Sequence, residues 1–471
     1  MSPKEAFYFA LGPIGAALLS VFILPLLTWY FNVEDIGRLA MLTTATSFCV
    51  LFFSLGLDQA YVREYHEVKD KSALFLSVIF PGLYFLVFTI VIFIIFGIDI
   101  AGLLFGISST FVFSLLLISI LCVFLSRYLG LILRMQERAL AYSMSQLLPK
   151  IFLLALIGFY ILFSVEATFQ YLLMANVFAS VAVLIVMLWN VKIDLLKSVF
   201  SKIDFVILKR MIGYGIPLIF SGLAYWGVTA VDRFLLRELS TFEELGIYSL
   251  AINFAAIGLV FQNIFTTVWV PIVYKWAANG VDAGKLDQVK DIVLLVIVMV
   301  FCLSAMLSWV ISFFLPPVYD QVQYILIPCL ACPLFYTLSE VTGIGIGIKR
   351  KTWFSLWATL ITLAVNTGAN LILIPIYGAT GAAIASAIAF FVFLLVRTES
   401  SIYLGQTFSR ANVYAFSLVS LVGCVFHVLY ARELFIYLYF FWLAFFVFTL
   451  FYFRNVIIKL IIALKVYRDA N

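Results

Sequence analysis

ALFLSVIFPGLYFLVFTIVIFIIFG, residues 73–97, is a long apolar run without a single charged side chain. The apolar positions are continuous, and the run is as long as a helix that crosses a hydrocarbon core of ~30 Å. Backbone groups in lipid must be paired within a helix or a closed barrel, and barrel strands alternate over ~10 residues. This stretch therefore predicts a membrane-spanning helix.

Similar apolar runs follow one another along the whole chain. We predict spans near residues 6–31, 36–58, 73–97, 102–126, 139–163, 167–190, 212–236, 246–273, 291–315, 321–348, 353–376, 379–404, 411–430 and 434–457. The composition agrees, because 65% of the 471 residues are hydrophobic and 11% are charged, whereas soluble domains have about 25% charged residues. We expect an all-α membrane protein of about 14 transmembrane helices, without a soluble domain large enough for an active site.

The basic residues set the predicted orientation. With a cytoplasmic N-terminus, all but five of the 29 Lys and Arg residues fall on the cytoplasmic side, as the positive-inside rule requires. Arg38, Arg237 and Arg432 fall outside, and Lys150 and Arg233 lie within spans. We predict a multi-pass membrane protein with both termini in the cytoplasm, and the family resemblance described below implies the bacterial cytoplasmic (inner) membrane. The first apolar run is longer than a signal-peptide core, so no cleavable signal is expected.

The two halves of the chain resemble each other at a nearly constant offset. Asn32-Val33-Glu34-Asp35-Ile36-Gly37 aligns with Thr241-Phe242-Glu243-Glu244-Leu245-Gly246, Leu125-Ser126 with Leu338-Ser339, and Ala167-Thr168 with Ala379-Thr380. Asn32 and Thr241 are predicted helix caps, with the acids in the first turn. Each copy holds six spans, an even number, which predicts two parallel six-helix repeats.

These offsets predict four parts of the chain. They are an N-terminal six-helix bundle at 1–190, a cytoplasmic amphipathic linker at 191–211, a C-terminal six-helix bundle at 212–405, and appended helices 13 and 14 with a cytoplasmic tail at 406–471. The linker mixes apolar residues with lysines, a composition that can lie on an anionic leaflet.

Several short motifs carry a family resemblance. They are Val33-Glu34-Asp35-Ile36-Gly37, Gly56-Leu57-Asp58-Gln59-Ala60-Tyr61-Val62-Arg63, Val231-Asp232-Arg233-Phe234-Leu235-Leu236 with Glu244-Leu245-Gly246-Ile247-Tyr248, and Leu373-Ile374-Pro375-Ile376-Tyr377-Gly378 with Gly381-Ala382-Ala383-Ile384-Ala385. In the order and spacing of these motifs, the chain resembles Wzx-type polysaccharide (O-antigen, repeat-unit) flippases. They belong to the multidrug/oligosaccharidyl-lipid/polysaccharide exporter superfamily, which includes the MATE transporters. The resemblance implies alternating-access transport of undecaprenyl-pyrophosphate-linked oligosaccharides from the cytoplasmic to the periplasmic leaflet, driven by H⁺ or Na⁺. It also implies contact with membrane lipids and with polysaccharide polymerase machinery.

A pyrophosphate headgroup needs cations along its path, and a charge inside a span costs at least ~2.5–3.5 kcal/mol. The predicted cations of a cavity between the two bundles are Lys150, Arg63, Arg233 and Arg237. Lys150, in the middle of its span, is the clearest candidate; pairing with an acid on another helix, or snorkelling, is the structural alternative. For Arg63 the alternative is a cytoplasmic anchor.

Three acids are candidates for coupling or gating. Asp58 lies near the inner end of the second span, and Asp232 near the outer end of the seventh. Glu340 lies deep in the tenth span without a nearby basic residue, and pairing with Lys150 is its structural alternative. Asn253, Tyr225 and Trp226 are possible sugar contacts, through an amide and two rings. No catalytic residue, metal, cofactor or nucleic acid is expected.

Two other function classes remain open. A multidrug or lipid II exporter of the same superfamily would share the fold. A membrane glycosyltransferase or polymerase, an enzyme, would use an acidic pair such as Glu34-Asp35 in an external loop. The recurrence of this pair as Glu243-Glu244 at a second helix start favours capping, so we expect a transporter and not an enzyme.

Overall fold

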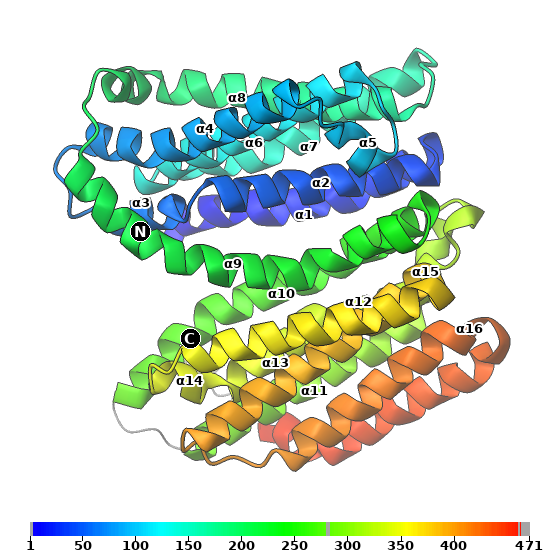
Figure 1. The fold of residues 1–471 in the computed structure, drawn as a ribbon. Coiled ribbons are helices and arrows are strands. Elements are labelled where there is room, and N and C mark those ends of the chain that lie inside the picture. The colour runs from blue at the N-terminus through cyan, green and yellow to red at the C-terminus, as the bar shows by residue number, and fades with distance from the viewer. Residues whose placement is uncertain (1–2, 279–282, 460–461, 463–471) are drawn as a thin grey trace. The chain divides into compact units, whose positions relative to one another are not determined.

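Helices account for nearly all of the chain that the computed structural model describes, which is residues 3–278, 283–459 and 462 (Figure 1). The chain divides into two units, Met1–Arg233 (unit 1) and Phe234–Asn471 (unit 2). Lys465 and Arg468, which belong to the predicted cytoplasmic tail, lie outside the described residues.

Unit 1 consists of consecutive helices joined by short turns. They are α1 (Pro3–Tyr30), α2 (Val33–Phe53), α3 (Leu57–Glu64), α4 (Lys71–Ile95), α5 (Ile100–Phe105), α6 (Thr110–Met135), α7 (Ala139–Leu162), α8 (Phe169–Val199) and most of α9 (Phe205–Leu239). The packing pairs α1 with α7, α6 with α8, and α2 with α6. Part of the core is the contact of Ile23 and Leu27 with Ile157 and Leu172.

Unit 2 holds the end of α9 and the helices that follow it, and it finishes with a hairpin. Its elements are α10 (Phe242–Ala278), α11 (Ala283–Leu307), the 3₁₀ turns η1 (Ser308–Phe313) and η2 (Pro317–Tyr319), α12 (Val322–Cys329), α13 (Ala331–Thr342), α14 (Ile344–Ile348), α15 (Trp353–Tyr403) and α16 (Ala411–Tyr452). The segment formed by α12 and α13 is the most buried of unit 2 and packs against α10 and α15, while α16 packs on α11.

Two of the long helices are hairpins. A straight helix of the 51 residues of α15 would be about 77 Å long, more than twice a hydrocarbon core. The backbone instead breaks at Gly378, which has φ 54° and ψ −128°, and a Cβ on Gly381 would lie 2.3 Å from the carbonyl oxygen of Leu373. In the same way α16 breaks at Leu434, and Trp442 Nε1 donates to His427 Nδ1 at 3.2 Å.

The number of membrane segments agrees with the prediction. Twelve helices of the described chain are long and apolar enough to cross a membrane, and the breaks in α15 and α16 raise the number of segments to fourteen. The all-α fold class is therefore confirmed.

Two predicted span boundaries are wrong. The span expected at 102–126 is instead α6 at Thr110–Met135, because the short helix α5 ends at Gly106 in the left-handed region and Ser109 caps a new start. The span expected at 36–58 ends at Phe53, because Leu55 and Gly56 both have positive φ. Arg127, assigned to a cytoplasmic loop, consequently lies inside α6.

The predicted linker is shorter than its sequence pattern indicated. Helix α8 continues to Val199 and α9 begins at Phe205, which leaves only residues 200–204 outside helices. The division between the two units falls within α9, after Arg233. The four-part division of the chain remains a prediction.

Candidate functional site

The break between α2 and α3 places a buried carboxylate in unit 1. Gly56, with φ 65°, turns the chain so that Asp58 falls in the first turn of α3. Its side chain is 10% exposed, and Oδ2 accepts from Arg127 Nη2 at 2.8 Å and from Gln59 Nε2 at 3.1 Å. Tyr128, which follows Arg127, donates to the carbonyl of Ser54 at 3.2 Å. The predicted gating acid Asp58 therefore has a fixed cation partner within its own unit.

A second set of charges lies at the other end of α3. Glu64 is buried and pairs with Arg210 at the start of α9. The Arg63 guanidinium lies over the ring of Tyr214, 4.6 Å from its centroid. Arg63, predicted as a pyrophosphate ligand, is exposed and makes this cation–π contact.

The middle of α9 contacts α2 through polar and aromatic side chains. Trp226 Nε1 donates to Ser47 Oγ at 3.0 Å, and its ring lies 5.0 Å from that of Phe48. Arg233 Nη1 donates to Thr44 Oγ1 at 3.3 Å. Asp232 next to it is 2% exposed. Within unit 1, the predicted residues Trp226 and Arg233 thus both contact α2.

Lys150 lies near the middle of α7, on the side that faces α1. Ser143 and Leu147 on this side approach α1 at Gly12 and Gly15, and Lys150 lies two helical turns after Ser143 at almost the same angle. The side chain is half-buried, and within the described part of the chain no hydrogen bond or ion pair satisfies its ammonium group.

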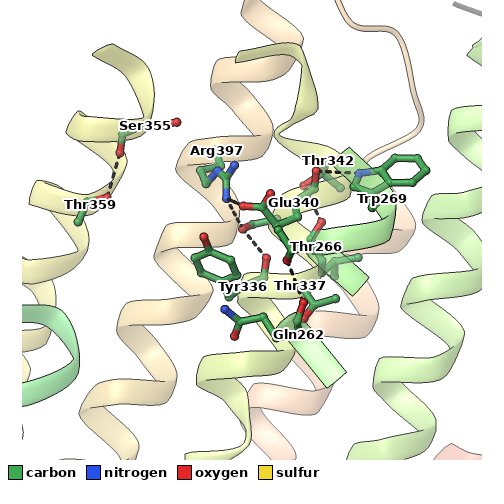
Figure 2. A network of polar contacts seen from close by, with 12 residues as sticks. Gln262, Thr266, Trp269, Tyr336, Thr337, Glu340, Thr342, Ser355, Thr359 and Arg397 are labelled. Carbon is green, nitrogen blue, oxygen red and sulfur yellow. Dashed lines mark hydrogen bonds and ion pairs between the residues drawn. The ribbon is translucent and has the colours of Figure 1, made fainter. Parts of the chain in front are cut away.

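Unit 2 contains a polar network around Glu340 (Figure 2). Arg397 Nη1 donates to Glu340 Oε1 and to Ser339 Oγ, the latter at 3.1 Å. Trp269 Nε1 donates to the backbone carbonyl of Glu340 at 3.3 Å. Both charged side chains are 11% exposed, and the ring of Tyr336 lies 5.8 Å from the Arg397 guanidinium.

This network corrects one expectation from the sequence. Lys150 was the structural partner expected for Glu340, and the observed partner is Arg397, 57 positions later. Arg397 lies within the second segment of α15, not in a loop. No local sequence pattern indicates this pair, because the two residues belong to different helices.

The two ion pairs occupy related positions in the repeat. Leu125-Ser126-Arg127 aligns with Leu338-Ser339-Glu340, so the cation of unit 1 and the anion of unit 2 correspond. Each pairs with an opposite charge in its own unit, Asp58 or Arg397. Each copy therefore has an ion pair at this aligned position, with the opposite charge and with a partner from a position that does not correspond.

The remaining predicted residues lie apart from these pairs. Arg237 pairs with the neighbouring Glu238 at 2.5 Å, and Asn253 is exposed with Nδ2 donating to the Ser249 carbonyl. Tyr225 precedes Trp226 and is half-buried. Within residues 3–278, 283–459 and 462, no group of His, Cys, Asp or Glu could hold a metal ion.

The capping prediction is half right. Thr241 Oγ1 accepts from the Glu244 N–H at 3.2 Å, as a cap does. Asn32 makes no capping hydrogen bond from its side chain, and the nearby Asp35 pairs with Arg38 instead.

One sequence-family profile matches more than half of the chain. It covers residues 2–276 and is described as "Polysaccharide biosynthesis protein". No curated protein sequence matches the chain significantly.

Solved transporter structures share the fold. A structure titled "Lipid II flippase MurJ, inward closed conformation" has a TM-score of 0.68 at 17% identity, and the match covers 95% of this chain and 99% of that chain. An inward-facing multidrug resistance MATE family transporter of the MOP superfamily has a TM-score of 0.58 at 14% identity, with 83% and 96% covered. A MATE protein in complex with Br-NRF has a TM-score of 0.52 at 16% identity, with 85% and 96% covered. The predicted MATE-like fold is thereby confirmed.

Proposed function

Because the chain belongs to the polysaccharide biosynthesis protein family, we propose that it flips undecaprenyl-pyrophosphate-linked oligosaccharide repeat units, such as those of O-antigen, across the bacterial inner membrane. The glycan moves from the cytoplasmic to the periplasmic leaflet while the lipid tail remains in hydrocarbon. The fold shared with MATE transporters supports alternating access and a transporter, not an enzyme. Polysaccharide polymerase machinery is the proposed recipient of the flipped glycan.

The observation that supports this proposal most directly is the half-buried ammonium group of Lys150 within a membrane span. A half-buried ammonium inside a span costs at least ~2.5–3.5 kcal/mol, and its helix places it among apolar residues of α1 and α7. Arg127 and Arg210, two other cations of unit 1, already pair with acids. A substrate phosphate would give Lys150 a strong charge-assisted hydrogen bond, and so would offset the cost of its burial.

The other predicted residues have supporting roles in this proposal. Arg63, Arg233 and Arg237 lie along the path of the pyrophosphate, and Tyr225, Trp226 and Asn253 contact sugars. Asp58 and Glu340 act in coupling or gating through their ion pairs, which H⁺ or Na⁺ opens and closes. Asp232 belongs to the same coupling set.

Glu34 and Asp35, the acidic pair that a glycosyltransferase or polymerase would use, both pair with an arginine in the structure. Arg38 Nη1 contacts Asp35 Oδ1 at 2.7 Å, and Nη2 contacts Glu34 Oε2 at 3.0 Å. Both carboxylates thus accept hydrogen bonds from one guanidinium, which disfavours a role as general base.

Transport by Lys150 variants tests the proposal. The protein is reconstituted in vesicles with lipid-linked repeat units isolated from the cells, and an impermeant lectin measures glycan arrival in the opposite leaflet. Loss of a charged hydrogen bond of about 1.5–3 kcal/mol lowers the Lys150→Ala rate by roughly 10–100-fold. Lys150→Arg retains part of the rate, because it keeps the charge.

Lys192→Ala is the matched control, since Lys192 is an exposed lysine near the end of α8. It should transport at the wild-type rate. If Lys150→Ala transports at the wild-type rate, Lys150 does not bind the substrate during transport. Absence of transport by the wild-type protein would contradict the proposed function itself.

A further inference from the structure

Unit 1 has a cavity of about 680 Å³ at the end that is predicted to face the periplasm. Its walls are the start of α2, the segment between α5 and α6, and the start of α8. The side chains that matter for a ligand are Asn32, Phe111, Glu166, Gln170 and Tyr171, together with the Asp35–Arg38 pair.

The lining has the chemistry of a sugar site. Asn32, Glu166 and Gln170 are exposed planar groups that offer donors and acceptors to neighbouring hydroxyls. Asn32 makes no capping hydrogen bond from its side chain, which leaves its amide available. Tyr171 and Phe111 are 37% and 47% exposed and present ring surface to an apolar sugar face.

The charge of the cavity selects an uncharged ligand. Asp35 and Glu166 are acids, and Arg38 already contacts both Asp35 and Glu34. Arg38 Nε also donates to the carbonyl of Phe105 at 3.1 Å. The excess of carboxylates repels phosphate and uronic acids, so the hydroxyls of a neutral sugar fit better.

In unit 2 the residue aligned with Asp35 makes a direct contact instead of lining a cavity. Glu244, which aligns with Asp35, accepts the N–H of Ala379 at 2.7 Å at the start of the second segment of α15. A Cβ on Gly378 would lie 2.5 Å from Glu244 Oε2. Ala379 aligns with Ala167, which lines the cavity in unit 1, so in unit 2 the acid aligned with Asp35 bonds directly to the segment aligned with that wall.

Two residue differences distinguish this part of unit 1 from the aligned part of unit 2. Asp35 is one methylene shorter than Glu244. Arg38, where unit 2 has Ile247, holds Asp35 by an ion pair within α2.

We propose that this cavity binds an uncharged sugar residue of the glycan at the periplasmic side of the membrane. The inference rests on the proposed function, because it takes the transported glycan as the ligand. The carboxylate and amide groups bind hydroxyls, and the Tyr171 ring stacks on the sugar face.

Binding of a phosphate-free glycan tests the inference. The probe is the free oligosaccharide released by mild acid from the lipid-linked repeat units of the same cells, titrated into the full-length protein in nanodiscs and followed by saturation-transfer NMR. Tyr171→Ala should weaken binding at least tenfold, and Tyr171→Phe should stay within about threefold because the ring is kept. Combining Asp35→Glu with Arg38→Ile copies unit 2 and should abolish binding.

Tyr437→Ala is the control, since Tyr437 is 71% exposed on α16, outside the cavity. It should bind as the wild type does. Three results would overturn the inference: no binding by the wild type, unchanged binding by Tyr171→Ala and the double variant, or tighter binding of a phosphorylated oligosaccharide.

Transport on the same preparations separates this inference from the proposed function. Transport by the wild type without binding of the free oligosaccharide contradicts the sugar cavity alone. Binding without transport supports the cavity and contradicts the flippase.

Discussion

Breaking the Glu340–Arg397 pair should destabilise unit 2 more than any surface change. Both side chains are 11% exposed, and removal of one partner from a buried pair costs about 3–5 kcal/mol because the other charge remains uncompensated. A domain as long as unit 2 shifts its Tm by about 2–4 °C per kcal/mol. Glu340→Gln should therefore lower the Tm by roughly 6–20 °C.

The double variant Glu340→Gln/Arg397→Met should recover most of this loss, because no unpaired charge remains. A thiol-reactive dye provides the assay, since Cys302 and Cys424 are buried in unit 2 and react only on unfolding. Replacing Cys49, Cys122 and the half-buried Cys332 by Ala restricts the signal to the buried thiols of unit 2. A loss below about 1 kcal/mol in Glu340→Gln, or additive losses in the double variant, would refute the reasoning.

Two further predictions concern unit 1, whose stability is followed with the dye in a variant that keeps the buried Cys122 and has the four cysteines of unit 2 replaced by Ala. Gly56→Ala should cost about 2–4 kcal/mol, since Gly56 has φ 65° and its Cβ would lie 2.3 Å from the Gly215 carbonyl. Gly97→Ala, with φ 62° and open space around it, should cost only about 1–2 kcal/mol. Equal losses in both would assign the effect to φ alone. Arg127→Met should destabilise unit 1 by about 1–3 kcal/mol, less than a fully buried pair, because Arg127 is half-exposed and Asp58 keeps the hydrogen bond from Gln59. Adding Asp58→Asn should restore stability. A double variant no more stable than Arg127→Met would show that the pair is not coupled.

The repeat offered partial guidance to the charged sites. The sequence repeat predicts that Arg127 aligns with Glu340 and that Asp35 aligns with Glu244. It does not predict the ion-pair partners of Arg127 and Glu340, because Asp58 and Arg397 do not occupy matching positions in the two copies. The sugar cavity was missed for the same reason: Glu166, Gln170 and Tyr171 become neighbours of Asn32 only when α2 and α8 start side by side.

Helix boundaries were predictable except where a short polar break interrupts an apolar run. Hydropathy does not register the positive φ at Gly56, which lies between two leucines. The helix start at Ser109 lies in a polar stretch of only three residues, Ser108-Ser109-Thr110, which is too short to lower the hydropathy of the surrounding apolar run. The breaks at Gly378 and Leu434 were anticipated, because a single helix through either hairpin would be too long for the bilayer.

The sequence by itself determined that this is a helical membrane protein of fourteen segments in two related halves. Apolar length and the need to pair every backbone group in lipid act locally, so they can be read residue by residue. Only the tertiary structure decided that Asp58 pairs with Arg127, that Glu340 pairs with Arg397, and that Lys150 lacks a partner among the described residues. Those outcomes depend on how each helix is rotated and which faces meet, and both follow from packing over the whole bundle.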